Sequence, residues 1–162
     1  MPQPFFVATH GDLPDPATLA SMSGLDAMRR VAEGTLPQAP IAKLLNFRLS
    51  DVSKGEAVFH GAPLFEHLNP MGGVHGGWYG ALLDSCMGCA VMTGLAPGRA
   101  YTTLEYKVNL VRAIPEGHAV IATGRVVHGG RTTAVAMGEI CCATTGRPFA
   151  TGSTTCLIMD AA

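Results

Sequence analysis

The sequence predicts a single α+β domain in which a curved antiparallel β-sheet wraps around one long central helix. Residues 75–94 are the most uniformly apolar stretch of the chain, and Asp84 is the one carboxylate in its interior. Two segments before this stretch and four after it alternate polar and apolar residues, as strands do. Because a helix that is apolar on every side must be covered on every side, a sheet folded around it is the economical arrangement.

Length and composition exclude several classes of protein. A chain of 162 residues fits one domain. Its residues are 48% apolar and only 14% charged, and association of identical chains would bury the surplus apolar surface. A net charge of −1 without a basic run argues against nucleic acid as a partner. The apolar run within this stretch is about 17 residues with an acid in its middle, short of the roughly 20 that a bilayer requires, so no membrane is expected. The N-terminus has no cationic start or long apolar stretch, so we expect a cytoplasmic protein.

The N-terminal part divides into an arm and a helical segment. Residues 1–15 are rich in Pro and Gly without periodicity, so we expect a poorly ordered arm. The domain is expected to span residues 16–162, and its first part, residues 16–45, is expected to be helical. A break at Ser23-Gly24 would divide the first helical pattern into two helices.

Strand patterns account for most of the remaining chain. Two short strands are expected before the long helix, at residues 46–52 and 56–62. Four strands are expected after it, at 103–110, 118–128, 131–143 and 149–159. Gly129-Gly130 is a strong hairpin pattern, so we predict that these four strands form an antiparallel meander.

The five cysteines do not suggest disulfides or a metal centre. An odd number in a chain that we expect to be intracellular favours reduced thiols. Cys86 and Cys89 have C-x-x-C spacing, but they lie about three turns into the helix and no second pair supplies further ligands. We therefore expect buried thiols, with no metal and no redox role.

The loop that leads into the long helix is the first place where chemistry could occur. Residues 69–77 bring glycines to the helix N-terminus, where backbone N–H groups lack partners and the positive end of the helix dipole lies. The N–H of Gly76 or Gly77 could hold an oxyanion there. The alternative is a glycine-rich turn without a ligand, with His75 a loop histidine rather than a base.

Asp84 is the second candidate. A carboxylate in an apolar helix is paired, protonated or functional. Asp84 follows Gly76 by eight residues, about 12 Å along a helix, so one reacting group cannot touch both residues of the same chain. If both serve one site, they come from two chains related by a two-fold axis. The alternative is a buried carboxylate that is simply hydrogen-bonded to neighbouring groups.

A longer pattern carries a family resemblance. It consists of Asn69, His75-Gly76-Gly77, Asp84, Thr103-x-Glu105 and the Gly130-Arg131 hairpin. Over about residues 24–160 the chain resembles the PaaI-like branch of the hotdog-fold acyl-CoA thioesterases. The resemblance implies a hotdog fold, a homodimer with two sites at its interface, and often a dimer of dimers. It also implies an acyl-CoA substrate, with coenzyme A as part of that substrate and no other cofactor.

The resemblance also implies roles for individual residues. The N–H of Gly76 and the side chain of Asn69 polarise the thioester carbonyl, and Asp84 of the other chain acts as general base or nucleophile. Thr103 positions the water, although the neighbouring Thr102, on the opposite face of the strand, could be the matching hydroxyl. Gly88, one turn after Asp84, carries no hydroxyl.

Further residues are expected to bind the substrate around this centre. They are His75, Gly77, Arg112, Gly130, Arg131 and Thr132, of which the arginines, together with Arg147, are candidates for the phosphates of coenzyme A.

The expected activity is hydrolysis of a small or medium, aliphatic or aromatic, acyl-CoA to the free acid and CoA. Two alternatives remain at this stage: a hotdog hydratase or dehydratase that pairs a histidine with an acid, and a non-catalytic acyl-CoA binding protein. The sequence leaves open the identity of the acyl group and the choice between dimer and tetramer.

Overall fold

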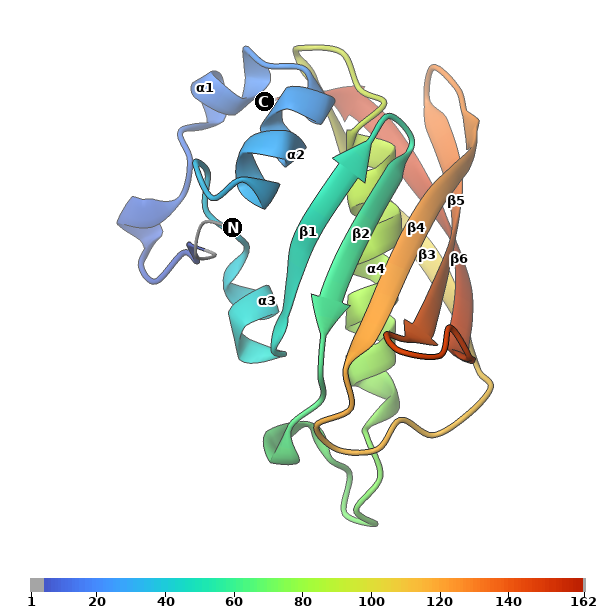
Figure 1. Ribbon diagram of the computed structural model, residues 1–162. Coiled ribbons are helices and arrows are strands. Elements are labelled where there is room, and N and C mark those ends of the chain that lie inside the picture. The colour runs from blue at the N-terminus through green and yellow to red at the C-terminus, as the bar shows by residue number, and fades with distance from the viewer. Residues whose placement is uncertain (1–4, 162) are drawn as a thin grey trace.

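The computed structural model describes residues 5–161 and has a hotdog architecture, with one long helix held inside a curved sheet (Figure 1). The central helix is α4 (Gly76–Met92). The strands are β1 (Phe47–Ser53), β2 (Glu56–Gly61), β3 (Arg99–Leu110), β4 (Val120–Gly129), β5 (Thr133–Cys142) and β6 (Pro148–Asp160). The shorter helices are η1 (His10–Asp12), α1 (Pro16–Ala20), α2 (Gly24–Ala32), α3 (Pro40–Leu44) and η2 (Phe65–His67). The α+β class, the curved antiparallel sheet and the N-terminal helices are as the sequence predicts.

The sheet order corrects the predicted meander. The six strands pair antiparallel in the order β1-β2-β4-β5-β6-β3, so only β4, β5 and β6 form a meander. β3 pairs with β6 at one edge, and residues 111–119 cross to β4. Two hydrogen bonds donated by its backbone fix the crossing: Val111 N–H donates to the Phe149 carbonyl at 2.8 Å, and Ile114 N–H donates to the Tyr79 side-chain hydroxyl at 2.9 Å. Strand periodicity gives no information on which strands pair, and this is why the prediction was wrong.

Helix α4 packs against the sheet through close contacts that require glycine. A Cβ atom at Gly124 of β4 would lie 2.2 Å from the carbonyl oxygen of Cys86, so only a glycine lets strand and helix approach this closely. A Cβ atom at Gly88 would lie 2.5 Å from the hydroxyl of Tyr101 on β3. The missing side chain at Gly88 thus makes room for the Tyr101 ring.

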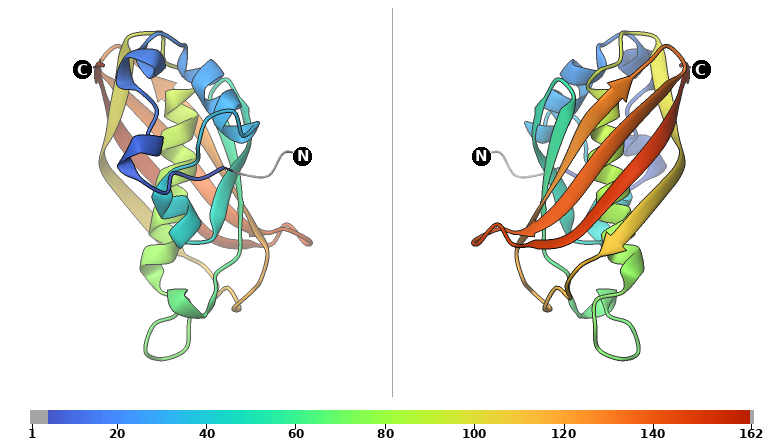
Figure 2. Two further views of the ribbon diagram at one scale, coloured as in Figure 1. Left: turned by 90° about the vertical axis from the view of Figure 1, so that its left-hand side faces the viewer. Right: turned by 90° about the vertical axis from the view of Figure 1, so that its right-hand side faces the viewer.

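The N-terminal segment covers the face of α4 that the sheet leaves open (Figure 2, left). The break at Ser23-Gly24 is present, with the Ser23 hydroxyl capping α2 by accepting from Asp26 N–H at 3.1 Å. Residues 1–4 lie outside the described residues, and in the rest of the expected arm the start is packed while most of residues 8–15 are exposed. Phe6 pairs with Gln38 in an isolated bridge and Val7 is buried.

Among the described residues, no helix combines the length and the hydropathy that crossing a bilayer requires.

Candidate active site

His75 caps the N-terminus of α4 and leaves one backbone donor free. It adopts an extended conformation (φ −62°, ψ 136°), and its Nδ1 accepts from Gly77 N–H at 2.9 Å. Trp78 N–H donates to the His75 carbonyl at 3.0 Å. Within residues 5–161 the Gly76 N–H has no hydrogen-bond partner, as expected for the first residue of a helix. Of the two candidate donors, Gly77 is therefore engaged by the cap and Gly76 is available.

Asn69 organises the loop before the helix. Its Oδ1 accepts from Met71 N–H at 2.9 Å and from Gly73 N–H at 3.2 Å. Its own N–H donates to the Gly73 carbonyl at 2.7 Å, and Gly72 completes the turn at φ +80°. Because the amide oxygen is held in this way, the Nδ2 donor is held within this loop, beside Gly73.

Asp84 lies half-buried in the middle of α4, and the structure brings Thr103 to it. The Thr103 hydroxyl donates to Asp84 Oδ1 at 2.9 Å. A β-bulge between Thr103 and Glu105 shifts the register of β3. Before the bulge, odd-numbered residues face α4. After it, even-numbered residues do: Tyr106 lies next to Gly80, and Leu110 lies next to Gly76. Thr102 is exposed on the other face of the strand.

One chain does not bring all the expected site residues together. Gly76 and Asn69 lie at the N-terminal end of α4, while Asp84 lies about 12 Å along the axis. Arg112 lies at the N-terminal end, where Nη1 donates to the Pro148 carbonyl at 2.9 Å. The β4–β5 turn, with Gly130, Arg131 and Thr132, lies at the opposite end, where the Arg131 carbonyl accepts from Arg99 Nη2 at 3.1 Å. These groups converge only if a second, antiparallel helix lies alongside the first.

The sequence profile of the thioesterase superfamily matches residues 71–149, which include α4, the bulged strand and the β4–β5 turn. Just under half of the chain is therefore similar in sequence to the thioesterase superfamily.

Solved structures extend the similarity beyond this range. A putative thioesterase of Ralstonia eutropha, described as phenylacetic acid degradation-related, is 26% identical, with a TM-score of 0.72 over 80% of this chain and 98% of that one. A hypothetical thioesterase of Streptococcus pneumoniae, solved with coenzyme A, is 26% identical, with a TM-score of 0.65 over 72% and 88% of the two chains. PaaI of E. coli, from the phenylacetic acid degradation operon, shares the fold at 21% identity, with a TM-score of 0.74 over 88% and 97%. A search of curated proteins finds no match.

The structure has a cavity beside Asp84 that sequence reasoning missed. Its volume is about 410 Å³, and it lies between α4, Tyr101 and the N-terminal segment. Residues 7–42 contribute much of its wall, although they lie outside the matched range. Gly88 was a sequence feature that could have indicated one wall of the cavity. A glycine in a helix leaves room for a neighbouring ring, and here the Tyr101 ring, which lines the cavity, lies against Gly88.

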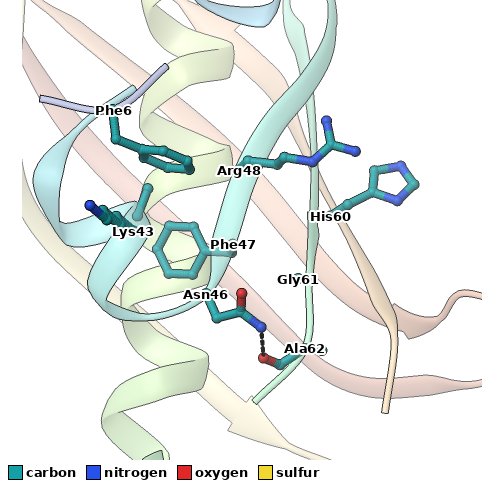
Figure 3. Close-up of a pocket in the computed structure, with 9 residues that line it drawn as sticks. Phe6, Lys43, Asn46, Phe47, Arg48, His60, Gly61 and Ala62 are labelled. Atoms are coloured by element: carbon teal, nitrogen blue, oxygen red, sulfur yellow. Dashed lines mark hydrogen bonds between the residues drawn. The ribbon is translucent and has the colours of Figure 1, made fainter. Parts of the chain in front are cut away.

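A second hollow, of about 450 Å³, has a lining that does not include Asp84 (Figure 3). Arg48 and His60, cross-strand neighbours on β1 and β2, lie on one side of it, and Phe6 and Lys43 lie on the other. Burial, with the nearby Arg48 charge, lowers the pKa of His60. None of the expected site residues lines this hollow.

The helix cysteines have the environment of buried thiols. Cys86 is fully buried, and burial raises the pKa of its thiol well above the usual range. Burial, followed by the Asp84 charge, raises the pKa of Cys89 to about 12. A thiol that keeps its proton at neutral pH is a poor nucleophile and a poor metal ligand. Within residues 5–161, no group of three or more His, Cys, Asp or Glu side chains is arranged to hold a metal ion.

Proposed function

We propose that this protein hydrolyses the thioester of a small or medium, aliphatic or aromatic, acyl-CoA to the free acid and CoA. The observation that carries the proposal is the placement of Asp84: a carboxylate in an apolar helix, oriented by Thr103 and facing an apolar cavity. The superfamily of the domain supports this reaction class. Two similar structures, from Streptococcus pneumoniae and Streptococcus mutans, were solved with coenzyme A and with acetyl-CoA.

The working unit is a homodimer, either alone or as a dimer of dimers. The edge strand β3 supports this, since it is 12 residues long and exposes several large apolar side chains, among them Leu104 at 58% exposure. A long exposed apolar edge is a surface on which a second chain pairs. Two chains that meet along β3 in antiparallel orientation bring Gly76 of one helix towards Asp84 of the other.

The dimer is tested by placing a charge on this edge. Leu104→Asp is expected to yield monomers in light scattering and to abolish thioester hydrolysis, because an aspartate at a buried interface remains unpaired. Leu44→Asp is the matched control, since Leu44 is 70% exposed on α3, away from β3. Monomers in the wild type, with full activity, would contradict the proposed unit.

Hydrolysis proceeds by general base catalysis at Asp84. Asp84 takes a proton from a water that Thr103 helps to position, and the water oxygen bonds to the thioester carbonyl carbon. The Gly76 N–H and the Asn69 amide of the partner subunit stabilise the resulting oxyanion. The carbon–sulfur bond then breaks, and the CoA sulfur leaves with the proton that Asp84 held. In the alternative route, an Asp84 carboxylate oxygen bonds to the carbonyl carbon, the carbon–sulfur bond breaks and CoA leaves as the thiolate; water then hydrolyses the mixed anhydride to the free acid and restores Asp84.

The remaining polar residues serve to bind coenzyme A. Arg112 and Arg131 are exposed and carry permanent charges suited to phosphate groups. Gly130 and Thr132 flank Arg131 in a tight turn, where the Gly130 N–H donates to the Thr133 carbonyl at 2.8 Å. His75 and Gly77 act through the helix cap, which keeps the free N–H of Gly76 directed at the carbonyl. No metal or further cofactor enters the reaction, so activity is expected to be unchanged by EDTA.

The proposal is tested by thiol release from a panel of acyl-CoA esters, with wild type and Asp84→Asn measured side by side. We expect turnover in the wild type and a fall of about a hundredfold or more in the variant, with substrate still bound. His75→Ala separates hydrolysis from hydration, since it weakens a hydrolase but abolishes a hydratase that uses the histidine. Binding without release of thiol from any ester would overturn the hydrolase in favour of a binding protein.

A further inference from the structure

The cavity beside Asp84 is enclosed by parts of the chain that lie far apart in sequence. One side consists of α4 residues, Asp84 and Ser85 among them, together with Tyr101 of β3. The other side is the N-terminal segment, with Leu19 of α1 and Met28 of α2 among its apolar residues. Figure 2 (left) shows these helices lying across α4 between the two edges of the sheet.

The cavity presents few polar groups to a ligand, because its polar side chains are mostly engaged elsewhere. Gln38 donates through Nε2 to the Leu49 carbonyl and accepts through Oε1 from the Leu49 N–H, both at 2.8 Å. The Ser85 hydroxyl donates to the Ala81 carbonyl at 2.7 Å. An apolar space with one reactive carboxylate at its side suits an apolar group attached to a reacting carbonyl.

The N-terminal helices are held firmly enough to act as a wall. The start of α2 lies directly against the C-terminal part of α4, where a Cβ atom at Gly24 would be only 1.8 Å from the Met92 carbonyl oxygen. Gly24 N–H donates to the Leu95 carbonyl at 3.0 Å, and Gly98 N–H donates to the Ala20 carbonyl at 2.8 Å. These contacts fix α1 and α2 relative to Asp84.

We propose that this cavity receives the acyl group of the thioester and that the N-terminal helices α1 and α2 set the longest acyl group the enzyme accepts. This inference rests on the proposed function. At the ~30 Å³ that a water-sized group occupies, a volume of about 410 Å³ holds roughly a dozen non-hydrogen atoms. The substrate class is therefore a medium-chain acyl or an arylacyl group without charge, and the segment that selects it lies outside the matched range 71–149.

The test narrows the cavity from the N-terminal side. Met28→Trp and Leu19→Trp each place a larger side chain in the wall, from two different helices, so the test does not depend on one variant folding. Arg30→Trp is the matched control, because it introduces the same side chain at an exposed position of α2. The kcat/KM values for acetyl-, hexanoyl-, phenylacetyl- and decanoyl-CoA are measured for each variant, and circular dichroism checks the fold.

We expect the wild type to favour decanoyl- over acetyl-CoA by at least tenfold, and both filling variants to lower this ratio at least tenfold. Arg30→Trp is expected to keep the wild-type ratio. If both filling variants fold and hydrolyse esters but keep the wild-type ratio, the cavity is not the acyl site. The same conclusion follows if Arg30→Trp changes the ratio as much as they do. If the wild type releases no thiol at all, the proposed function fails instead. In that case, calorimetry with decanoyl-CoA tests whether the cavity binds the acyl group. Met28→Trp and Leu19→Trp are then expected to weaken decanoyl-CoA binding at least tenfold, and unchanged binding would overturn the cavity as the acyl site.

Discussion

The free N–H of Gly76 can be removed without disturbing the helix that carries it, by the substitution Gly76→Pro. Gly76 is the first residue of α4, where a proline ring fits and the N–H has no helical partner to lose. His75, at ψ 136°, already has the extended conformation that a following proline requires. A Cβ atom at position 76 would meet its nearest neighbour, Leu110 Cδ1, at an ordinary 3.7 Å. We therefore expect the free energy of unfolding to stay within about 1 kcal/mol of the wild type.

The expected effect on catalysis is large by comparison. Removing one oxyanion donor costs about 3 kcal/mol of transition-state stabilisation, a fall of ~10²–10³ in kcat. Gly76→Ala is the matched control, because it adds the Cβ atom and keeps the N–H, so it is expected to retain kcat within about threefold. Thiol release gives kcat and KM, and urea unfolding gives the stability. A folded Gly76→Pro variant with the kcat of Gly76→Ala would refute the assignment of this N–H to the oxyanion.

Two further predictions concern packing and ionisation. Gly88→Ala is expected to lower the free energy of unfolding by about 1–3 kcal/mol in urea titrations, because the new methyl group meets the Tyr101 hydroxyl at 2.5 Å. The loss is expected to be smaller in a Tyr101→Phe background, and an equal loss there would contradict the steric reason. Hydrogen bonds from Thr145 and His118 lower the pKa of Cys142 to about 6. Because Cys142 is only 6% exposed, its thiolate is followed by ultraviolet absorbance against Cys142→Ser; the signal is expected to rise as pH increases through about 6, and His118→Ala to move the midpoint upward. A wild-type midpoint near 9 would contradict the effect of these hydrogen bonds.

The central helix and its carboxylate could be predicted because their pattern is local. An apolar run with one acid in its interior indicates a covered helix wherever the chain goes next. The residues of β3 that face α4 could not be predicted in the same way. The β-bulge after Thr103 changes which residues of the strand face α4, and periodicity alone assigns a single face to an uninterrupted strand.

The cavity beside Asp84 could not be predicted from the sequence for a related reason. It depends on the N-terminal helices lying across α4, and helical periodicity shows which residues share a face without showing what that face covers. The Pro- and Gly-rich start of the chain gave no indication that Val7 would be buried. Such contacts between distant segments are determined by the packing of the whole domain.

The claim on which the mechanism depends is that each site takes its oxyanion donor from one chain and its base from the other. Mixing Gly76→Pro with Asp84→Asn tests it directly, after the chains are unfolded and refolded together. Random pairing of equal amounts of the two variants makes half of the dimers mixed. If sites are shared between chains, each mixed dimer has one intact site out of two, so thiol release recovers to roughly a quarter of the wild-type rate. If both groups of a site came from the same chain, every site would keep one defect. The mixture would then stay as inactive as the separate variants, and the account of a shared active site would be contradicted.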